Sequence, residues 1–307
     1  MIVSKSQRLT QMIQGLGPAL VSLLVWDFVI VVCYKVLHWT WVGSSHLPLG
    51  SIGTVIGIIV GFRNGSAYAR WWEARTLWGA IVNRSRTLAR QVMTIMSPER
   101  AKTPAERAEI AALQRDLVLH QVAYVHSLSK QLRGLDPVPT FVLLAPKEDP
   151  AQLSGEKNLA LTIQARMSAM LVEACQRGWL NDWQWQAIDQ SMASLMDSQG
   201  GVERIKNTPM PKQFDFFPRL FVQLYCLFLP VGMVINLGWY TPLGSTMVGA
   251  MFLALERIGQ VLEDPFENKI NDVSMTAIAT TIEINLRQLL GETELPPPAK
   301  PVDGILW

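Results

Sequence analysis

Three long apolar runs divide the chain, at residues 16–34, 47–62 and 220–255. A helix that crosses a bilayer needs about 20 mostly apolar residues, with a range of roughly 17 to 25. The first run meets that length, whereas the second is short and needs either a tilt or residues beyond Arg63. The third is too long for one crossing, and the Asn, Gly and Pro residues in NLGWYTPLGS predict a helical hairpin, at 221–237 and from 242 to 255 or beyond. The pattern therefore predicts four transmembrane helices.

Lysine and arginine residues predict the orientation of these helices. Segment 38–48 and the hairpin turn contain none, whereas segment 63–219 contains 20 of the 27 in the chain, and Lys5 and Arg8 precede the first run. Since basic loops stay on the cytoplasmic side, we expect both termini and segment 63–219 in the cytoplasm. The first run is too long for the core of a secretory signal and no A-x-A cleavage site follows it, so we expect it to be retained as a span.

The same pattern predicts four parts: the first and second transmembrane helices (1–62), a cytoplasmic helical region (63–219), the transmembrane hairpin (220–258), and a cytoplasmic helix with a Pro-rich tail (259–307). Within the cytoplasmic region we expect a Pro-rich linker at 136–150 and a last helix that breaks at Gly200 and Gly201. The predicted fold is an all-α membrane protein in which four transmembrane helices continue into a cytoplasmic helical bundle.

Composition narrows the class of protein. Charged residues make up 17% of the chain and hydrophobic residues 49%, whereas soluble globular chains contain about 25% charged residues. This argues against a disordered chain or an ordinary cytosolic enzyme. A net charge of +2 does not indicate a nucleic-acid partner. With three Cys in no CxxC motif, four separate His and no GxGxxG, P-loop, HExxH or GxSxG motif, we expect no metal centre, no cofactor and no enzyme activity.

The second run carries a specific pattern of small residues. Gly53, Gly57 and Gly61 recur at four-residue spacing, which places them on one face of a helix and lets another helix approach closely in lipid. Thr54, Ile58 and Phe62 form a parallel row one position further on, which is a candidate pore lining. In a symmetric oligomer this row would become rings around an axis, and apolar rings gate by dewetting. Periodicity alone favours the alternative that the ridge only packs against another span.

Two ionisable residues fall in or beside the apolar runs. Asp27 lies within the first run, and Glu256 lies at the end of the hairpin. A charged residue inside a membrane is expected to be functional and to have a buried partner. The sequence does not identify the partner of Asp27.

Three segments resemble one known family. GFRNGSAYARWWEAR, LEDPFENKINDVSM and IEINLRQL, in that order, are similar to segments of the bestrophin ion channels, specifically those of bacteria. The resemblance implies a homopentamer with one axial pore whose narrow neck is lined by Thr54, Ile58 and Phe62, and it reverses the preference for the packing alternative. Family necks are usually apolar at all three positions, so Thr54 is a departure. The family's second constriction, at the cytoplasmic exit, would fall at or near Gln184, before the expected Gly200–Gly201 break.

Calcium is not expected to bind. Animal members of the family bind it through an acidic run after N-P-F, but the corresponding stretch here, DPFENKIND, keeps only Glu267 and Asp272, with Lys269 between them. Calcium takes six to eight oxygen ligands, and a lysine in the loop opposes its charge.

The resemblance implies passive conduction of small monovalent ions across a bacterial inner membrane, with other copies of the chain and membrane lipids as partners. Chloride is the family's ion, although bacterial members could equally favour cations. A structural or signalling membrane protein whose cytoplasmic bundle binds a partner is the main alternative. A transporter is a weaker one, because neither inverted repeats nor broken midplane helices are evident.

Overall fold

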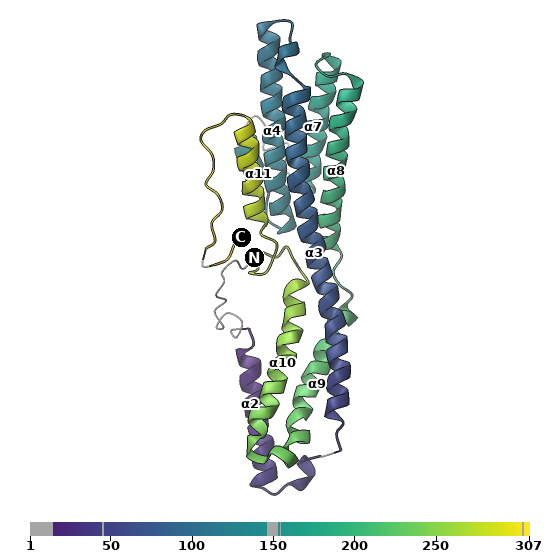
Figure 1. Cartoon of the computed structure of the whole chain (residues 1–307), viewed down its shortest axis with the longest axis vertical. Helices are drawn as coiled ribbons and strands as arrows, with labels where there is room; N and C mark the ends of the chain where they lie inside the picture. The colour runs from purple at the N-terminus through teal and green to yellow at the C-terminus, as the bar shows by residue number, and fades with distance from the viewer. Residues whose placement is uncertain (1–14, 45, 146–152, 154, 303) are drawn as a thin grey trace. The chain divides into compact units, whose positions relative to one another are not determined.

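The computed structural model describes residues 15–44, 46–145, 153, 155–302 and 304–307. The described residues fold into helices joined by loops and turns, as predicted. Lys5 and Arg8 lie outside the described residues. The helices are α2 (Gly17–Lys35), α3 (Leu49–Ile95), α4 (Pro104–Leu132), α5 (Val138–Leu144), α7 (Leu159–Gln176), α8 (Asp182–Asn207), α9 (Lys212–Leu237), α10 (Thr241–Leu262) and α11 (Met275–Leu289). Figure 1 shows their course along the chain.

The chain folds into two compact units. One, here called the membrane unit, comprises Ser4–Trp71 and Pro209–Asp264 and contains α2, the first part of α3, α9 and α10. The other, here called the bundle unit, includes Trp72–Thr208 and Pro265–Trp307 and contains the rest of α3 with α4, α5, α7, α8 and α11. Helix α3 is continuous from Leu49 to Ile95 and belongs to both.

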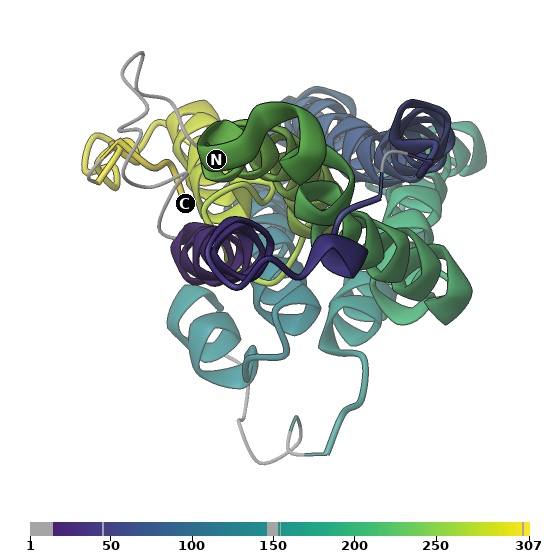
Figure 2. The same cartoon turned by 90° about the horizontal axis from the view of Figure 1, so that it is seen from below.

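The membrane unit has a small apolar core. Helices α2, α9 and α10 run side by side (Figures 1 and 2), and α3 joins them through Ile56 and Val60. The buried side chains of this core are Leu23, Ile56, Val60, Val222, Tyr225, Cys226 and Leu229. Many apolar side chains outside the core are exposed, for example Val21 at 62% and Met247 at 66%. A soluble protein rarely exposes so much apolar surface in one region, so this unit is suited to lipid.

Two described stretches are long and apolar enough to cross a membrane. One is α2, and the other, Lys212–Leu262, holds both α9 and α10. The predicted hairpin is therefore present, with longer arms, and its turn is the short 3-10 helix Gly238–Tyr240. The apolar part of α3 is shorter and ends at Arg63.

The bundle unit packs around α4. Helices α5, α7 and α11 all contact it, and Val122, Tyr124 and Leu128 in its middle are fully buried. At the start of the helix, the N-cap residue Thr103 accepts a hydrogen bond at Oγ1 from Glu106 N, and the Glu106 carboxylate accepts one from Lys102 N, just before the helix.

The predicted break at Gly200 and Gly201 is wrong. Helix α8 continues through both glycines to Asn207. A Cβ on Gly201 would lie 2.8 Å from Leu77 Cδ1, so this glycine allows α8 to approach α3 closely instead of ending the helix.

The Pro-rich linker at 136–150 also contains a helix that the sequence pattern did not predict. Helix α5 spans Val138–Leu144, with prolines at its start, where a missing N–H costs nothing. Its Phe141 is fully buried and packs edge-on against His120, with ring centroids 5.9 Å apart. A single buried aromatic side chain therefore fixes a short helix against α4.

A buried carboxylate joins α4 to α11. Glu283 Oε2 lies 2.9 Å from His126 Nε2, and Glu283 Oε1 accepts a hydrogen bond from Arg287 Nε at 2.8 Å. Burial alone would raise the pKa of Glu283, but the hydrogen bond and charge of His126, together with the Arg287 guanidinium, hold the pKa below its ordinary value.

This contact is expected to make the bundle unit sensitive to acid. A carboxyl with a lowered pKa in the folded chain contributes stability above its unfolded value, about 4.3 for Glu, and loses that stability as pH falls through the folded value. Below about pH 4.3 the melting temperature of the wild type should therefore fall more steeply than that of Glu283→Gln. Glu294→Gln, which changes an exposed carboxyl in the tail, should behave as the wild type does. Equal slopes for Glu283→Gln and the wild type would contradict the expectation.

Candidate functional site

Three side chains on α3 form an exposed row on the membrane unit. Thr54, Ile58 and Phe62 follow at four-residue spacing along one face of the helix. Ile58 is 54% exposed and Phe62 is 73% exposed, although both are large and apolar. Thr54 Oγ1 donates a hydrogen bond to Gly50 O at 2.9 Å, so its methyl group and oxygen lone pairs remain at the surface. The assignment of this row to a pore neck stays a prediction.

The opposite face of α3 is buried in the membrane unit. Ile56 and Val60 are 5% and 1% exposed and pack in the same core as Val222 and Leu229 of α9. The row and the buried face lie on opposite sides of one helix because 3.6 residues make one turn. Within the described residues, the row therefore lies outside the packed core of the chain.

The predicted glycine ridge divides into two parts. Gly53 is buried, and a Cβ there would lie 2.6 Å from Tyr225 Oη, so α9 requires a glycine at this position. By contrast, no atom of the described residues lies within 4 Å of a Cβ on Gly57 or Gly61, apart from the helix's own nearby backbone. One glycine thus serves packing inside the chain, and two leave an open strip beside the row.

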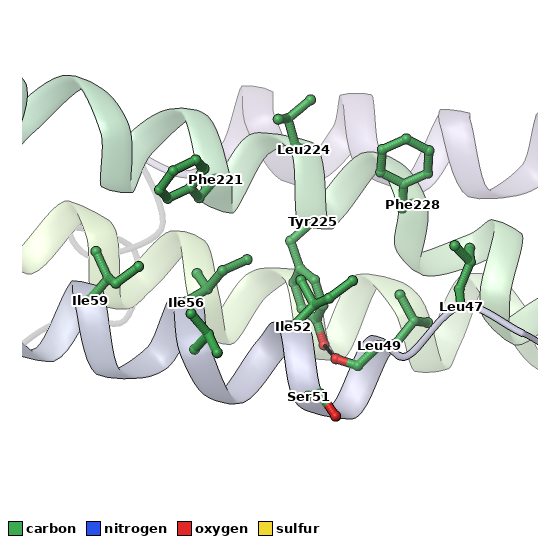
Figure 3. A pocket seen from close by; sticks show the side chains of 11 residues that line it. Leu47, Leu49, Ser51, Ile52, Ile56, Ile59, Phe221, Leu224, Tyr225 and Phe228 are labelled. Carbon is green, nitrogen blue, oxygen red and sulfur yellow. Dashed lines mark hydrogen bonds between the residues drawn. The ribbon is translucent and has the colours of Figure 1, made fainter.

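An apolar groove lies on the other side of the row, between α3 and α9 (Figure 3). Its volume is about 530 Å³. Tyr225 reaches across it, and its hydroxyl donates a hydrogen bond to Leu49 O at 3.3 Å. The side chains that line it are Leu47, Leu49, Ser51, Ile52, Val55, Ile56, Ile59, Phe221, Leu224, Tyr225 and Phe228. The row is thus flanked by a small-residue strip on one side and an apolar groove on the other.

A buried arginine follows the row directly. Arg63 is 2% exposed and binds the carboxylates of Asp215 and Glu263. In the sequence, Arg63 is recognisable only as the boundary of an apolar run. An arginine at that boundary, with acidic residues near the ends of the two hairpin helices, was the available signal, but the spacing of 152 residues to Asp215 could not show the contact.

The buried Asp27 is satisfied by two hydroxyl groups. Ser245 Oγ donates to Asp27 Oδ1 at 2.9 Å, and Thr246 Oγ1 donates to Asp27 Oδ2 at 2.8 Å. Asp27 is fully buried, so these contacts join α2 to α10 inside the membrane unit. The partners of Asp27, which the sequence does not identify, are therefore two neutral hydroxyl groups.

A comparison with protein families decides the class of this chain. A model described as Bacterial/Fungal Bestrophin protein matches residues 7–288. The chain belongs to the bestrophin family. Similar bestrophin relatives include two proteins named voltage-dependent anion channel-forming protein. That of Mesorhizobium japonicum is 32% identical over 83% of this chain and 78% of its own length. The protein of Ralstonia nicotianae is 30% identical over 91% of this chain and 89% of its own length.

Solved bestrophin structures share the fold. A crystal structure of a bacterial bestrophin homologue from Klebsiella pneumoniae is 29% identical and superposes with a TM-score of 0.81, covering 90% of this chain and 98% of that one. The predicted bestrophin-like, all-helical membrane fold is therefore confirmed.

Gln184, the residue predicted for the cytoplasmic aperture of a bestrophin pore, lies in the first turn of α8. Its backbone N–H donates to Asn181 Oδ1 at 2.8 Å, and its side-chain Oε1 accepts from Asn181 N at 3.1 Å, which forms a capping box. The Gly200–Gly201 break from which this position was counted does not exist. Gln184 therefore has a local structural role, and its place in an aperture stays a prediction.

The loop that binds calcium in animal bestrophins is held by protein groups here. The Glu267 carboxylate binds Lys206 Nζ at 2.5 Å, and Asp272 Oδ2 accepts a hydrogen bond from Lys269 N at 2.9 Å. Asp272 is 3% exposed, and burial raises its pKa. Among the described residues, no three His, Cys, Asp or Glu side chains are grouped to hold a metal ion.

Current through this bestrophin is therefore expected to be insensitive to micromolar calcium. Too few carboxylates face one point to replace the water around the ion. The measurement is single-channel current in a planar bilayer with calcium buffered from nanomolar to millimolar concentrations. A calcium titration of current that Asp272→Ala abolishes would contradict the expectation, whereas Glu267→Gln tests the second carboxylate independently.

Proposed function

We propose that this bestrophin forms a homopentameric channel with one axial pore and conducts small monovalent anions passively, chloride among them. The observation that carries the proposal is the exposed row Thr54, Ile58 and Phe62 on α3. Three side chains at four-residue spacing become three stacked rings when copies of α3 surround an axis. The names of the relatives, anion channel-forming proteins, support the choice of ion.

The two flanks of the row support assembly. If the row faces an axis, its flanks face the two neighbouring copies, because the remaining face of α3 is buried in its own protomer. One flank is the strip at Gly57 and Gly61, and the other is the apolar groove between α3 and α9. Small residues allow close approach of a neighbouring helix in lipid. Two different flanks that meet head to tail generate a closed ring when the rotation closes.

The proposed setting is a bacterial inner membrane. Helices α2, α9 and α10 and the first part of α3 would cross it, with Trp39, Trp41, Trp239 and Tyr240 at the outer interface, where aromatic side chains are favoured. Segments 63–219 and 259–307 would then be cytoplasmic, and Gln184 would lie near the cytoplasmic exit. The four predicted parts of the chain remain the proposed domain division.

Apolar rings alone do not determine the sign of the permeant ion. Ile58 and Phe62 carry no charge, and an ion that passes them loses water contacts that nothing replaces. Weakly hydrated anions lose less than strongly hydrated ones, so bromide and iodide are expected to pass more readily than fluoride.

Reconstitution tests the proposal. Purified wild-type chain in a planar bilayer under a KCl gradient should show single-channel currents whose reversal potential approaches that of chloride. Reversal near the potassium potential would show a cation channel. A monodisperse monomer by light scattering in mild detergent, without currents, would overturn the channel proposal.

A further inference from the structure

We propose that Arg63 is a positioning residue for the pore neck. Arg63 fixes the rotation of α3 about the helix axis, and this rotation determines where the Phe62 side chains lie in the ring. The inference rests on the proposed function, because it assumes that Phe62 lines the pore. The group formed by Arg63, Asp215, Glu256 and Glu263 is called the Arg63 clamp below.

The clamp holds Arg63 to two other helices. Arg63 Nη1 donates a hydrogen bond to Glu256 O at 3.1 Å, which joins α3 to α10. Arg63 Nη2 donates to the carboxylate of Asp215, in the first turn of α9, and to Glu263 Oε2 at 3.3 Å. The guanidinium is planar and carries its donors in a fixed fork, so several acceptors together determine its orientation. A lysine at this position would lack that geometry.

Two further donors of α3 hold the same end of α10. Asn64 Nδ2 donates to Leu255 O at 2.8 Å, and Arg70 Nε donates to Glu263 O at 2.8 Å. Glu263 follows the last residue of α10, where backbone carbonyls have no partner within the helix. The inner end of α10 is therefore joined to α3 over about two turns, from Arg63 to Arg70.

The contact between α3 and α10 is also close. A Cβ on Gly259 of α10 would collide with the Asn64 side-chain oxygen and with Arg63 Nη1. Because Gly259 has no side chain, the Arg63 guanidinium passes directly against the backbone of α10. The rotation of α3 at this level is thus limited by sterics as well as by hydrogen bonds.

Rotation of α3 would move the neck. Phe62 and Arg63 are consecutive, so they point about 100° apart around the same rigid helix. A side-chain atom roughly 5–6 Å from the helix axis moves by about 2 Å when the helix rotates by about 20°. A shift of that size in every subunit is comparable to the radius of a small ion. Arg63 is 2% exposed, whereas Phe62 is 73% exposed, so Arg63 would act on ions only through the position of Phe62.

A double-mutant cycle tests this role. Asp215→Asn removes the charge that Arg63 binds and nearly preserves the size of the side chain. It is made in the wild type and in Phe62→Ala, and single-channel conductance and open probability are measured for all four chains. We expect Asp215→Asn to change one of these quantities by about threefold or more in the wild type and to have no effect when Phe62 is absent, because coupled residues are not additive. Asp264→Asn, which removes an exposed carboxylate beside the clamp, is the matched control and should change neither quantity.

A merely structural role predicts a different result. In that case Asp215→Asn lowers the melting temperature of the assembly but leaves the current of assembled channels unchanged, or changes it equally in both backgrounds. Either outcome would overturn the positioning role. Glu263→Gln weakens the contact between Arg63 and Glu263 and is combined with Phe62→Ala in the same double-mutant cycle. The test therefore remains decisive if the Asp215→Asn chain does not assemble. Phe62→Ala alone tests the neck, so a failure of the proposed function is visible separately.

Discussion

Replacing Phe62 by alanine is expected to raise single-channel conductance by about tenfold, the effect of lowering a barrier by roughly 1.4 kcal/mol. An ion in a ring of Phe side chains loses water contacts that the ring does not replace. Alanine widens the ring and admits water, and Ile58→Ala should act in the same direction. Thr54→Ala should matter less, because a hydroxyl oxygen can accept hydrogen bonds from water and so offers an ion's hydration shell a partner. The measurement is conductance in planar bilayers under symmetric chloride.

The alternative, in which the row only packs against protein, predicts the opposite. Removing a buried Phe side chain costs about 3–5 kcal/mol of stability and would lower the yield of assembled protein without raising current. Since Phe62 is 73% exposed in the protomer, its truncation should leave the melting behaviour of the chain itself unchanged. Val21→Ala, on an exposed apolar position of α2, is the control and should leave conductance unchanged. Reduced or equal current in an assembled Ile58→Ala, Phe62→Ala double mutant would remove the row from the pore.

Sequence periodicity predicted the helices well where local pattern determines them. Hydropathy placed α2 and the hairpin, because length and apolar content are properties of a single segment. Glycine was a poor guide to helix ends. The same residue type terminates a helix after Leu289, at Gly291 with positive φ, and stays helical at Gly201, where Leu77 requires the space. Which of the two applies depends on a neighbour that no local pattern contains.

The polar contacts of the membrane unit also depend on neighbours that are distant in sequence. Asp27 was recognised as a buried charge, but Ser245 and Thr246 are 218 and 219 residues away and are unremarkable in sequence. The Arg63 clamp likewise joins three helices across long separations. The row on α3 could be predicted because it lies within three turns of one helix. The contacts that hold α3 in place come from α9 and α10, which are distant in sequence, so only the folded structure shows them.

The second large effect concerns assembly. It distinguishes Gly57, which has no close neighbour within the described chain, from Gly53, which packs against Tyr225. Gly57→Leu is expected to leave the protomer folded, because no atom of the described residues other than nearby backbone of the same helix lies within 4 Å of a Cβ there. If a neighbouring copy packs on this strip, the larger side chain costs about 1–3 kcal/mol at each interface of a ring. The pentamer should then dissociate, as measured by light scattering in mild detergent, and currents should disappear.

Gly53→Leu is expected to disrupt the fold of the single chain, not its assembly with other copies. A Cβ at Gly53 would lie 2.6 Å from Tyr225 Oη within the same protomer, so this substitution is expected to lower the melting temperature and the yield of the chain itself. Gly17→Leu, at the start of α2 with no described atom within 4 Å of a Cβ apart from neighbouring backbone, is the control and should leave both assembly and stability unchanged. A Gly57→Leu chain that stays pentameric and conducts would show that the strip faces lipid or water, and that neighbouring copies meet on some other face of α3.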